Sequence, residues 1–299
     1  MQLEGVYSVL PTPFTASGDL DITSLRQVID LFVEAGVNGV TALGATGEAA
    51  RLSEDERRQV LEAVVEHVNG RIGVVVGASA DGTRTCINYS RHARNAGATA
   101  VLVSPPWMPR LDSEAVLRHF QALADAVDIE IVVQDSPATC GFAMEAWLLA
   151  RIAKEVPRAR TIKLEDPPTP FKTSGILQAC GDVHVRIFGG LGGVFLLEEL
   201  MAGATGTMTG FAFPEVLVNI VALYRSGRVD EAADMFYKSV PLMRFEFQEG
   251  IGMAIRKEML RRRGALASPA TRAPDAALDD PTRAALDRVM KYTEQFIRA

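Results

Sequence analysis

The sequence has 299 residues, enough for one large domain or two ordinary ones, and 48% of them are apolar while 23% are charged. This balance is typical of a folded globular protein and excludes disordered, collagen-like and coiled-coil chains. The 31 basic and 37 acidic residues give a net charge of −6, so no positive field attracts nucleic acid or an anionic membrane. We therefore expect neither nucleic acid nor a membrane as a partner.

The cysteine content and the N-terminal residues indicate a cytoplasmic protein. Cys86, Cys140 and Cys180 are too few and too scattered for a disulfide framework or a thiolate metal site, and we expect them to be buried free thiols. Residues 1–4 hold neither the basic nor the apolar segment of a secretory signal. No uncharged stretch approaches the roughly 18 apolar residues that a membrane span needs.

Short apolar runs alternate with longer stretches of helical periodicity along the first three quarters of the chain. The predicted strands are Gly5–Leu10, Gly39–Ala42, Ile72–Gly77, Ala100–Ser104, Glu130–Gln134, Thr161–Leu164, Val185–Gly189 and Gly206–Thr209. Several are apolar throughout, as strands of a parallel sheet buried on both faces are. Eight β/α units within about 225 residues predict an α/β protein with a closed (β/α)8 barrel, a TIM barrel.

An open, doubly wound sheet is the structural alternative. Its dinucleotide-binding form carries Gly-x-Gly-x-x-Gly after the first strand, whereas Leu-Pro-Thr-Pro-Phe stands here at 10–14. Helix signals also fit the barrel, since apolar residues of Ile22–Ala35 share one face. Ser53 and Glu56 form a capping box that opens a helix ending at Val68.

Beyond Gly227 the strand signals stop. Helices are predicted at 230–240, 250–263 and 280–298, and the segment 265–281, rich in Ala, Pro, Ser and Asp, is predicted to be an exposed connector. We therefore divide the chain into a barrel, residues 1–226, and a C-terminal helical region, residues 227–299, packed on it.

Lysine is scarce, with six residues against 25 arginines. Five lie in predicted helices or at their ends, where an ammonium group is ordinarily solvated, and only Lys163 lies in a strand. A lysine that points into a barrel loses water, which disfavours its charged form, and a neutral amine is the nucleophile that forms a Schiff base with a carbonyl substrate. The alternative is an ordinary lysine that pairs with Glu165 or extends to solvent.

The segment Gly44–Glu48 follows the second strand. Two glycines around Thr46 permit a tight turn in which backbone N–H groups and the hydroxyl converge on a carboxylate. The alternative is an ordinary glycine-rich turn.

A set of short motifs, in a fixed order, carries a family resemblance. They are Leu10-Pro-Thr-Pro-Phe14, Gly44-x-Thr-Gly-Glu48 with Leu52-Ser53-x-x-Glu56, Pro105-Pro-Trp107, Asp135-x-Pro137, Ile162-Lys163 and Gly203-Ala-Thr-Gly206. Together they resemble the dihydrodipicolinate synthase and N-acetylneuraminate lyase family of Schiff-base (class I) aldolases and dehydratases, over essentially the whole chain. The resemblance implies that Lys163 forms the Schiff base and that Thr46 and the Gly47 backbone bind the carboxylate of a pyruvate-like 2-oxo acid. It also implies no cofactor and a homotetramer or homodimer.

The departures from the family pattern bear on the substrate. Gln134 stands where the family has a proton-relay tyrosine, Ala45 replaces a relay threonine, and Trp107, which lacks a phenol, replaces a second relay aromatic. An amide is not a general acid or base. Thr139 lies near where dihydrodipicolinate synthases carry the arginine for a second carboxylate. We therefore expect that the lysine-biosynthesis reaction is not the activity.

The residues around strands five to eight instead resemble the 2-keto-3-deoxy-L-arabonate dehydratase branch, which also has Gln at the tyrosine position. The matching segments are Val133–Pro137, Lys163-x-Glu165 and Gly206–Gly210, while the 44–48 loop keeps its aldolase-like form. We expect dehydration of a 2-keto-3-deoxy sugar acid through a Lys163 imine. The expected catalytic residues are Lys163, Gln134 and Glu165, and the expected substrate-binding residues are Ala45, Thr46, Gly47, Trp107, Ser136, Gly189 and Met208.

Two other functions stay open. One is a pyruvate-dependent class I aldolase that cleaves a 2-keto-3-deoxy sugar acid or a related 2-oxo acid. The other is a non-catalytic protein that binds 2-oxo acids, although such a protein would not need Lys163. A metal-dependent aldolase is disfavoured, and we expect no metal, because no ligand-like spacing joins the four histidines, His67, His92, His119 and His184.

Overall fold

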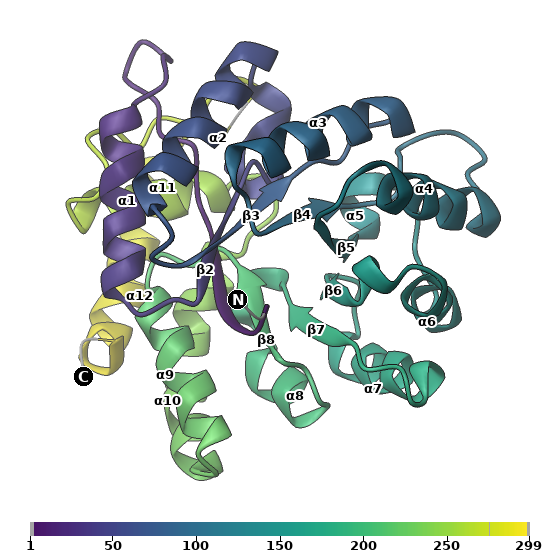
Figure 1. Cartoon of the computed structure of the whole chain (residues 1–299). Coiled ribbons are helices and arrows are strands. Elements are labelled where there is room, and N and C mark those ends of the chain that lie inside the picture. Colours follow the sequence, from purple (N-terminus) through teal and green to yellow (C-terminus); the bar gives the residue numbers. More distant parts are fainter. Residues whose placement is uncertain (1–2, 275, 298–299) are drawn as a thin grey trace.

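Eight parallel strands close into one barrel in the computed structural model, which describes residues 3–274 and 276–297 (Figure 1). The strands are β1 (Gly5–Val9), β2 (Gly39–Ala42), β3 (Gly73–Gly77), β4 (Ala100–Val103), β5 (Glu130–Asp135), β6 (Thr161–Leu164), β7 (Arg186–Gly189) and β8 (Gly206–Thr209). Each strand pairs with the next, and β8 pairs with β1. The predicted TIM barrel is confirmed, and its strand bounds agree with the structure to within one residue.

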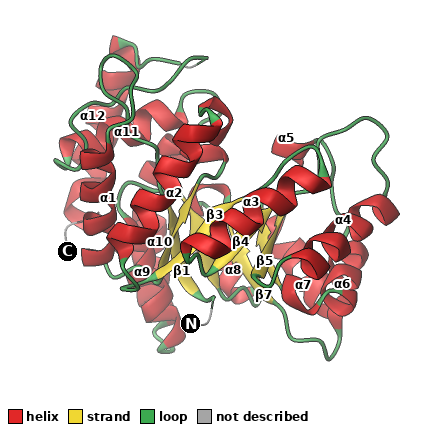
Figure 2. Cartoon of the chain, turned by 45° about the horizontal axis from the view of Figure 1, so that its top comes forward, coloured by secondary structure: helices red, strands yellow, loops and turns green. Residues whose placement is uncertain are grey.

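Helices surround this barrel on its outer side (Figure 2). They are α1 (Ile22–Glu34), α2 (Glu54–Val68), α3 (Thr83–Ala96), α4 (Ser113–Ala126), α5 (Pro137–Cys140), α6 (Ala146–Glu155), α7 (Thr169–Cys180), α8 (Leu196–Met201) and α9 (Pro214–Arg225). The capping box of α2 is confirmed, since the Ser53 hydroxyl accepts from the Glu56 N–H and the Glu56 carboxylate accepts from the Ser53 N–H. This exchange satisfies two backbone donors that the first helical turn leaves unpaired.

The C-terminal region consists of α10 (Val229–Glu246), α11 (Gly252–Arg262) and α12 (Asp280–Ile297). Figure 1 shows α12 at the left of the molecule, and α12 packs against α10, which in turn packs against α9. The predicted end of α10 at Val240 is wrong, because the helix continues through Pro241 and buries Leu242 and Met243. Packing therefore outweighs the break that proline favours. Arg298, the predicted last residue of α12, lies outside the described residues.

The expectation of an exposed connector after α11 is wrong for its first half. Ala265 and Leu266 are buried, and Arg272 makes hydrogen bonds to the Gly18 carbonyl oxygen and to both oxygens of the Glu56 carboxylate. The Arg272 guanidinium also lies 4.2 Å from the centroid of the Phe14 ring. Composition did not reveal these contacts because the partners are more than 200 positions away in the sequence.

Large side chains fill the middle of the barrel. Tyr7 and Phe188 pack edge to face, with ring centroids 5.5 Å apart, in a buried cluster that also contains Met208. Gly39 and Gly73 make room for Tyr7, since a Cβ atom at either position would meet its ring. Burial raises the pKa of Tyr7 to about 12, so its phenol stays neutral. The interior is therefore a packed core that closes the barrel below the ends of the strands.

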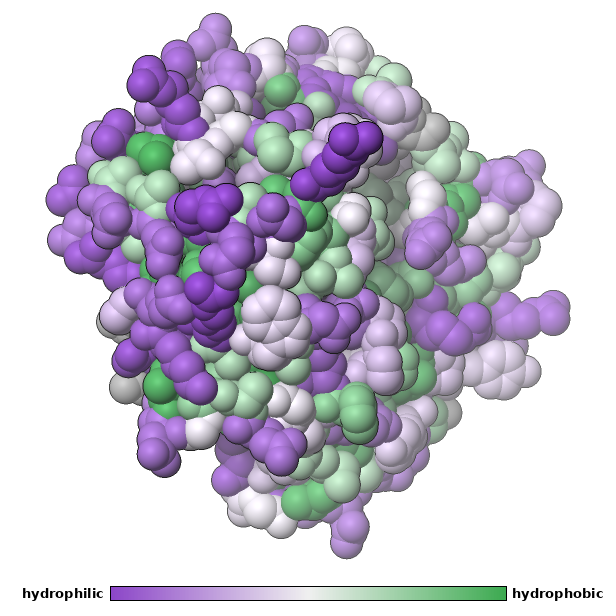
Figure 3. Space-filling view, turned by 90° about the vertical axis from the view of Figure 1, so that its right-hand side faces the viewer, coloured by the Kyte–Doolittle hydropathy of each residue, from purple (hydrophilic) through white to green (hydrophobic). Residues whose placement is uncertain are grey.

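No helix in the described part of the chain is long and apolar enough to cross a membrane. Figure 3 shows hydrophilic and hydrophobic residues intermixed on one face of the molecule. All three cysteines are buried and free, as predicted.

We predict that Gly39→Ala destabilises the barrel. The added Cβ would overlap the Tyr7 ring and lie 2.7 Å from the Gly73 carbonyl oxygen, and overpacking of a core typically costs about 1–3 kcal/mol. Urea unfolding measures this loss. Gly82→Ala is the matched control, because the nearest atom to its added Cβ is 3.9 Å away. Equal stabilities of the two variants would contradict the close packing around Tyr7.

Candidate active site

Lys163 and Gln134 lie side by side at the carboxyl ends of neighbouring strands. Residues of β5 and β6 pair so that Gln134 is opposite Lys163. Both side chains point into the barrel. Gln134 lies two residues after the core residue Val132 on β5, and Lys163 pairs with the core residue Phe188 on β7. Lys163 is 5% exposed and Gln134 6% exposed. In TIM barrels this end of the strands carries the catalytic groups.

Glu165 joins these two residues into one cluster. Its Oε1 lies 3.1 Å from Lys163 Nζ, and its Oε2 accepts a hydrogen bond of 2.7 Å from Gln134 Nε2. The Glu165 N–H donates to the Asp135 carbonyl oxygen, which fixes the backbone just beyond β6. Gly190 leaves the space for this side chain, because a Cβ there would overlap Glu165. The structure thus brings together the three residues predicted to be catalytic.

Asp135 and Lys172 form a second charged group behind this cluster. Lys172 on α7 bonds to Asp135, which has no exposed surface, and to Asp166 after β6, at 2.5 and 2.6 Å. Burial raises the pKa of Asp135, and the Lys172 ammonium opposes this rise. The expectation that lysines outside the strands are solvated is wrong for Lys172. The pair links the ends of β5 and β6, the strands that carry Gln134 and Lys163.

The 44–48 loop forms one turn of 3₁₀ helix, Ala45–Gly47, at the mouth of the barrel. The N–H groups of Gly47 and Glu48 bond within the turn, to the carbonyl oxygens of Gly44 and Ala45. The first N–H groups of a helical turn have no acceptor inside it, and the Thr46 hydroxyl makes no hydrogen bond with any described residue. The N–H groups at 45 and 46 and the Thr46 hydroxyl are thus the donors of this turn that have no acceptor among the described residues. The Gly47 N–H, which the sequence analysis also expected to bind a carboxylate, is bonded to the Gly44 carbonyl oxygen.

A pocket of about 290 Å³ opens between the loops that follow β2 to β5. Its lining includes Ala45, Ser79, Ser104, Trp107, Gln134 and Thr139. Trp107 is 67% exposed and its indole packs beside Gly141. A larger cavity of about 390 Å³ lies between α2 and α3, but it contains none of the predicted catalytic residues.

The other predicted substrate-binding residues do not line this pocket; they are Thr46, Gly47, Ser136, Gly189 and Met208. Lys163 and Glu165 are not part of its lining either, and Gln134 is the predicted catalytic residue that connects it to their cluster. Ser136, 5% exposed, precedes α5. Met208 has no exposed surface and belongs to the core cluster with Tyr7 and Phe188. Gly189 faces α8, since a Cβ there would overlap the Glu199 carboxylate. Any effect of Met208 or Gly189 on a ligand would therefore act through packing.

Glu199 is a buried carboxyl group that the sequence analysis missed. It lies on α8 with no exposed surface, and one of its oxygens accepts a hydrogen bond of 2.6 Å from Thr169. Burial raises the pKa of Glu199 to about 7. A glutamate in the predominantly apolar segment 196–201 was the available signal, but Glu198 beside it is an ordinary, partly exposed residue.

The comparisons with known proteins identify the family. The Dihydrodipicolinate synthetase family matches residues 2–293. This chain belongs to that family. Its members are lyases of the Schiff-base type, which gives a chemical meaning to the buried lysine at the barrel mouth. No group of three or more His, Cys, Asp or Glu residues in the described ranges could hold a metal ion.

Individual relatives differ in their named activities. The chain is 33% identical over 296 residues to the L-2-keto-3-deoxyarabonate dehydratase of Azospirillum brasilense, covering 98% of this chain and 95% of that protein. It is also 33% identical over 291 residues to the 4-hydroxy-tetrahydrodipicolinate synthase of Pelobacter propionicus, covering 96% and 98%. A crystal structure of dihydrodipicolinate synthase from Rhodopseudomonas palustris superposes with a TM-score of 0.91 at 34% identity, covering 97% of each chain.

We predict that Glu199 makes stability fall as pH rises through weakly acidic values. Its pKa is about 7 in the folded protein against an ordinary 4.5, so the unfolded chain loses this proton first as pH rises. The protonated folded state is therefore favoured at low pH, and this advantage, at most about 3 kcal/mol at 1.36 kcal/mol per pKa unit, is lost between pH 4.5 and 7.

Glu199→Gln removes this titration while keeping the shape of the neutral acid. The stability of the variant relative to the unmodified protein should therefore rise between pH 4.5 and 7 and stay level above pH 8, measured by urea unfolding. Glu62→Gln, at an exposed position on α2, is the control and should show no such trend. A Glu199→Gln difference that is independent of pH would contradict the raised pKa.

Proposed function

We propose that this protein dehydrates a 2-keto-3-deoxy sugar acid through an imine on Lys163. The observation that carries the proposal is the placement of the Glu165 carboxylate between Lys163 Nζ and the Gln134 amide, at 3.1 and 2.7 Å. The named activity of the Azospirillum relative agrees with this chemistry. The chain is equally identical to this dehydratase and to a synthase, at 33%. The choice between the two activities therefore rests on the residues of the site.

Imine formation requires a neutral amine at Lys163. Glu165 Oε1 lies 3.1 Å from Nζ and can take the ammonium proton, after which Nζ attacks C2 of the 2-oxo acid. Glu165 then returns this proton to the former carbonyl oxygen, which leaves C2 as water, and the carboxylate is free again. The protonated imine then withdraws electrons from the C2–C3 bond. This effect favours loss of a proton from C3, because the electron pair that remains moves toward nitrogen.

Elimination needs a base at C3 and a hydrogen-bond donor near the hydroxyl on C4. C3 is two bonds from Nζ in the imine, so a carboxylate 3.1 Å from Nζ is close enough to serve as this base. When the C3 proton moves to the Glu165 carboxylate, the electron pair forms the C3–C4 double bond. The C4 hydroxyl takes that proton back from Glu165 and leaves as water, so the carboxylate is regenerated. Gln134 can donate a hydrogen bond and so orient Glu165 or the C4 hydroxyl. It cannot accept the proton of the C4 hydroxyl, as a retro-aldol cleavage would require.

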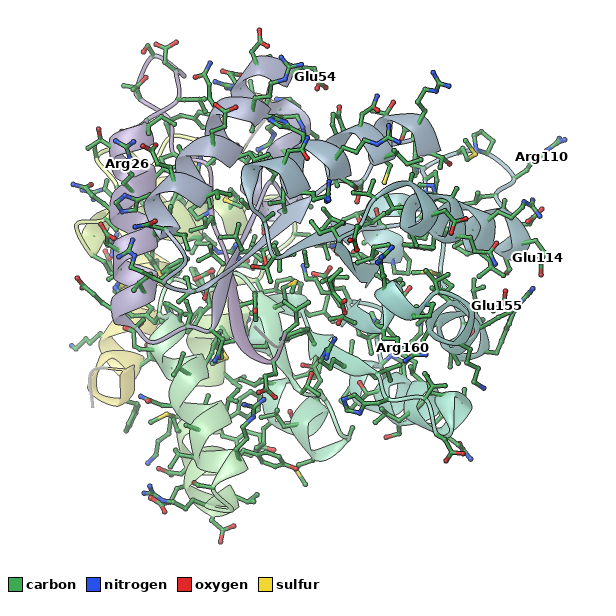
Figure 4. The ribbon with its side chains drawn as sticks, in the orientation of Figure 1. Arg26, Glu54, Arg110, Glu114, Glu155 and Arg160 are labelled. Atoms are coloured by element: carbon green, nitrogen blue, oxygen red, sulfur yellow. The ribbon has the colours of Figure 1, made fainter. Side chains whose placement is uncertain are left out.

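The pocket supports a hydroxylated substrate that has a single carboxylate. Hydroxyl groups of Ser79, Ser104 and Thr139 line it, and the first two are 3.1 Å apart. Arg57, the arginine of its lining, is held by the carbonyl oxygens of Gly77 and Ala49. Arg110, in the same loop as Trp107, is exposed and projects outward at the edge of the molecule (Figure 4). Position 139 is a threonine, so no arginine is present there to bind a second carboxylate of the substrate.

Incubation with 2-keto-3-deoxy-L-arabonate, followed by mass analysis of the products, tests the reaction type. We expect a product lighter by one water and, on borohydride addition, a stable mass increase on the peptide that contains Lys163. Lys163→Ala should abolish both. Lys154→Ala, an exposed lysine on α6, is the control and should retain both.

Other products would support other functions. Pyruvate together with an aldehyde would show an aldolase. Borohydride adducts of 2-oxo acids without turnover of any would show a binding protein. Efficient condensation of pyruvate with aspartate semialdehyde would show a synthase. It would overturn the inference that Thr139, in place of an arginine, excludes that reaction. Labelling that persists in Lys163→Ala would overturn the role of that lysine.

We predict that Glu165→Gln separates imine formation from elimination. General-base assistance is typically worth about 10²–10⁴ in rate, so kcat should fall by that factor. Borohydride trapping of the substrate on Lys163, followed to its end point, should persist, because water can take the ammonium proton in a slower imine-forming step. Glu145→Gln, at an exposed position before α6, is the control. Unchanged turnover in Glu165→Gln would assign the base to another group.

A further inference from the structure

Helix α11 carries two adjacent cations that are almost completely buried. Arg256 is 3% exposed and pairs with Glu246, whose carboxylate accepts the Ala212 N–H beyond β8. Lys257 has no exposed surface and pairs with Glu48, the last residue of the 44–48 loop beyond β2. One C-terminal helix therefore contacts the loops of two strands that flank β1.

The surroundings of Lys257 keep it away from solvent. Its Nζ donates to the Ala270 carbonyl oxygen at 2.8 Å and lies 4.4 Å from the centroid of the Phe14 ring. Arg272 covers the same ring, and its backbone N–H donates to Glu48 Oε2 at 3.0 Å. The carboxylate of Glu48 is thus held by groups from α11 and from the segment after it, with Arg51 as its partner within the loop region.

Glu48 needs these contacts because its backbone is in an unfavourable conformation. Its φ of +57° is in the left-handed region, which residues other than glycine rarely adopt. Such a conformation persists only where the surroundings impose it. The preceding residue is also held, since the Thr12 hydroxyl donates to the Gly47 carbonyl oxygen at 2.6 Å. The direction of the N–H groups at 45 and 46 depends on these anchors.

We propose that Lys257 is a positioning residue for recognition of the substrate carboxylate. Through Glu48 it fixes the 3₁₀ turn at 45–47, and so it sets how strongly the enzyme prefers a 2-oxo acid over an uncharged carbonyl compound. The inference rests on the proposed function in one respect, that this turn binds the carboxylate of the molecule that forms the Lys163 imine. Lys257 is fully buried and contacts Glu48, and it is not part of the lining of the pocket between the loops after β2 to β5.

A pair of probes that differ only at the carboxylate tests the inference. Pyruvate and methyl pyruvate present the same ketone, and cyanoborohydride trapping on Lys163 gives a rate constant for each in separate reactions. The unmodified protein should prefer pyruvate. Lys257→Met should lower the ratio of the two rate constants about tenfold, by slowing pyruvate while leaving the ester nearly unchanged.

Two further variants distinguish a loss of positioning from a folding defect. Glu48→Gln/Lys257→Met removes both charges and leaves no unpaired buried carboxylate, and it should show the same lowered ratio. Lys257→Arg keeps the charge and should recover part of the preference. Lys238→Met, at a surface ion pair on α10, is the control and should keep the full ratio.

The outcomes separate this inference from the proposed function. An unchanged ratio in the folded variants, or an equal loss for acid and ester, overturns the role of Lys257 and leaves the dehydratase proposal standing. If the unmodified protein traps neither probe, the Lys163 imine fails, and the inference built on it fails too. Trapping of pyruvate with no dehydration of the sugar acid overturns the proposed reaction alone.

Discussion

The site depends on one constraint, the burial of an ammonium group on the inner face of a closed barrel. Lys163 rises from a core filled by Tyr7 and Phe188, and the neighbouring carboxylate is Glu165, two residues further along the same chain segment. Because water is largely excluded there, the attraction between the amine and the carboxylate is stronger than it would be at the surface. The segment 163–165 at the end of β6 thus supplies both the amine and the carboxylate of the cluster.

The replacement of a phenol by Gln134 changes what the neighbouring strand contributes. An amide cannot relay a proton, but its N–H orients Glu165 at 2.7 Å. The carboxylate is thereby held between the Gln134 amide and Lys163 Nζ. In the reaction that we propose, Glu165 would be the single group that removes the proton beside the imine carbon.

The C-terminal helices contribute to the barrel mouth although they supply none of the residues predicted to be catalytic. Lys257 and Arg256 reach the loops after β2 and β8 through buried carboxylates, and Arg272 ties the following segment to Glu56 and Gly18. A buried ion pair adds little net stability, because desolvation offsets the attraction, but its geometry is specific and breaking it is costly. These pairs therefore fix the positions of loops more than they strengthen the fold.

The sequence by itself determined the barrel, because strands buried on both faces have an unmistakable apolar pattern and the capping box of α2 is a local signal. It also singled out Lys163, since a lysine in such a strand is exceptional. Only the tertiary structure showed that Gln134 and Glu165 meet, that Gly189 faces α8, and that Lys172 and Lys257 are buried. The three contacts of Gln134, Lys172 and Lys257 join residues 31 to more than 200 positions apart, and local sequence carries no record of which distant partner will neutralise a charge.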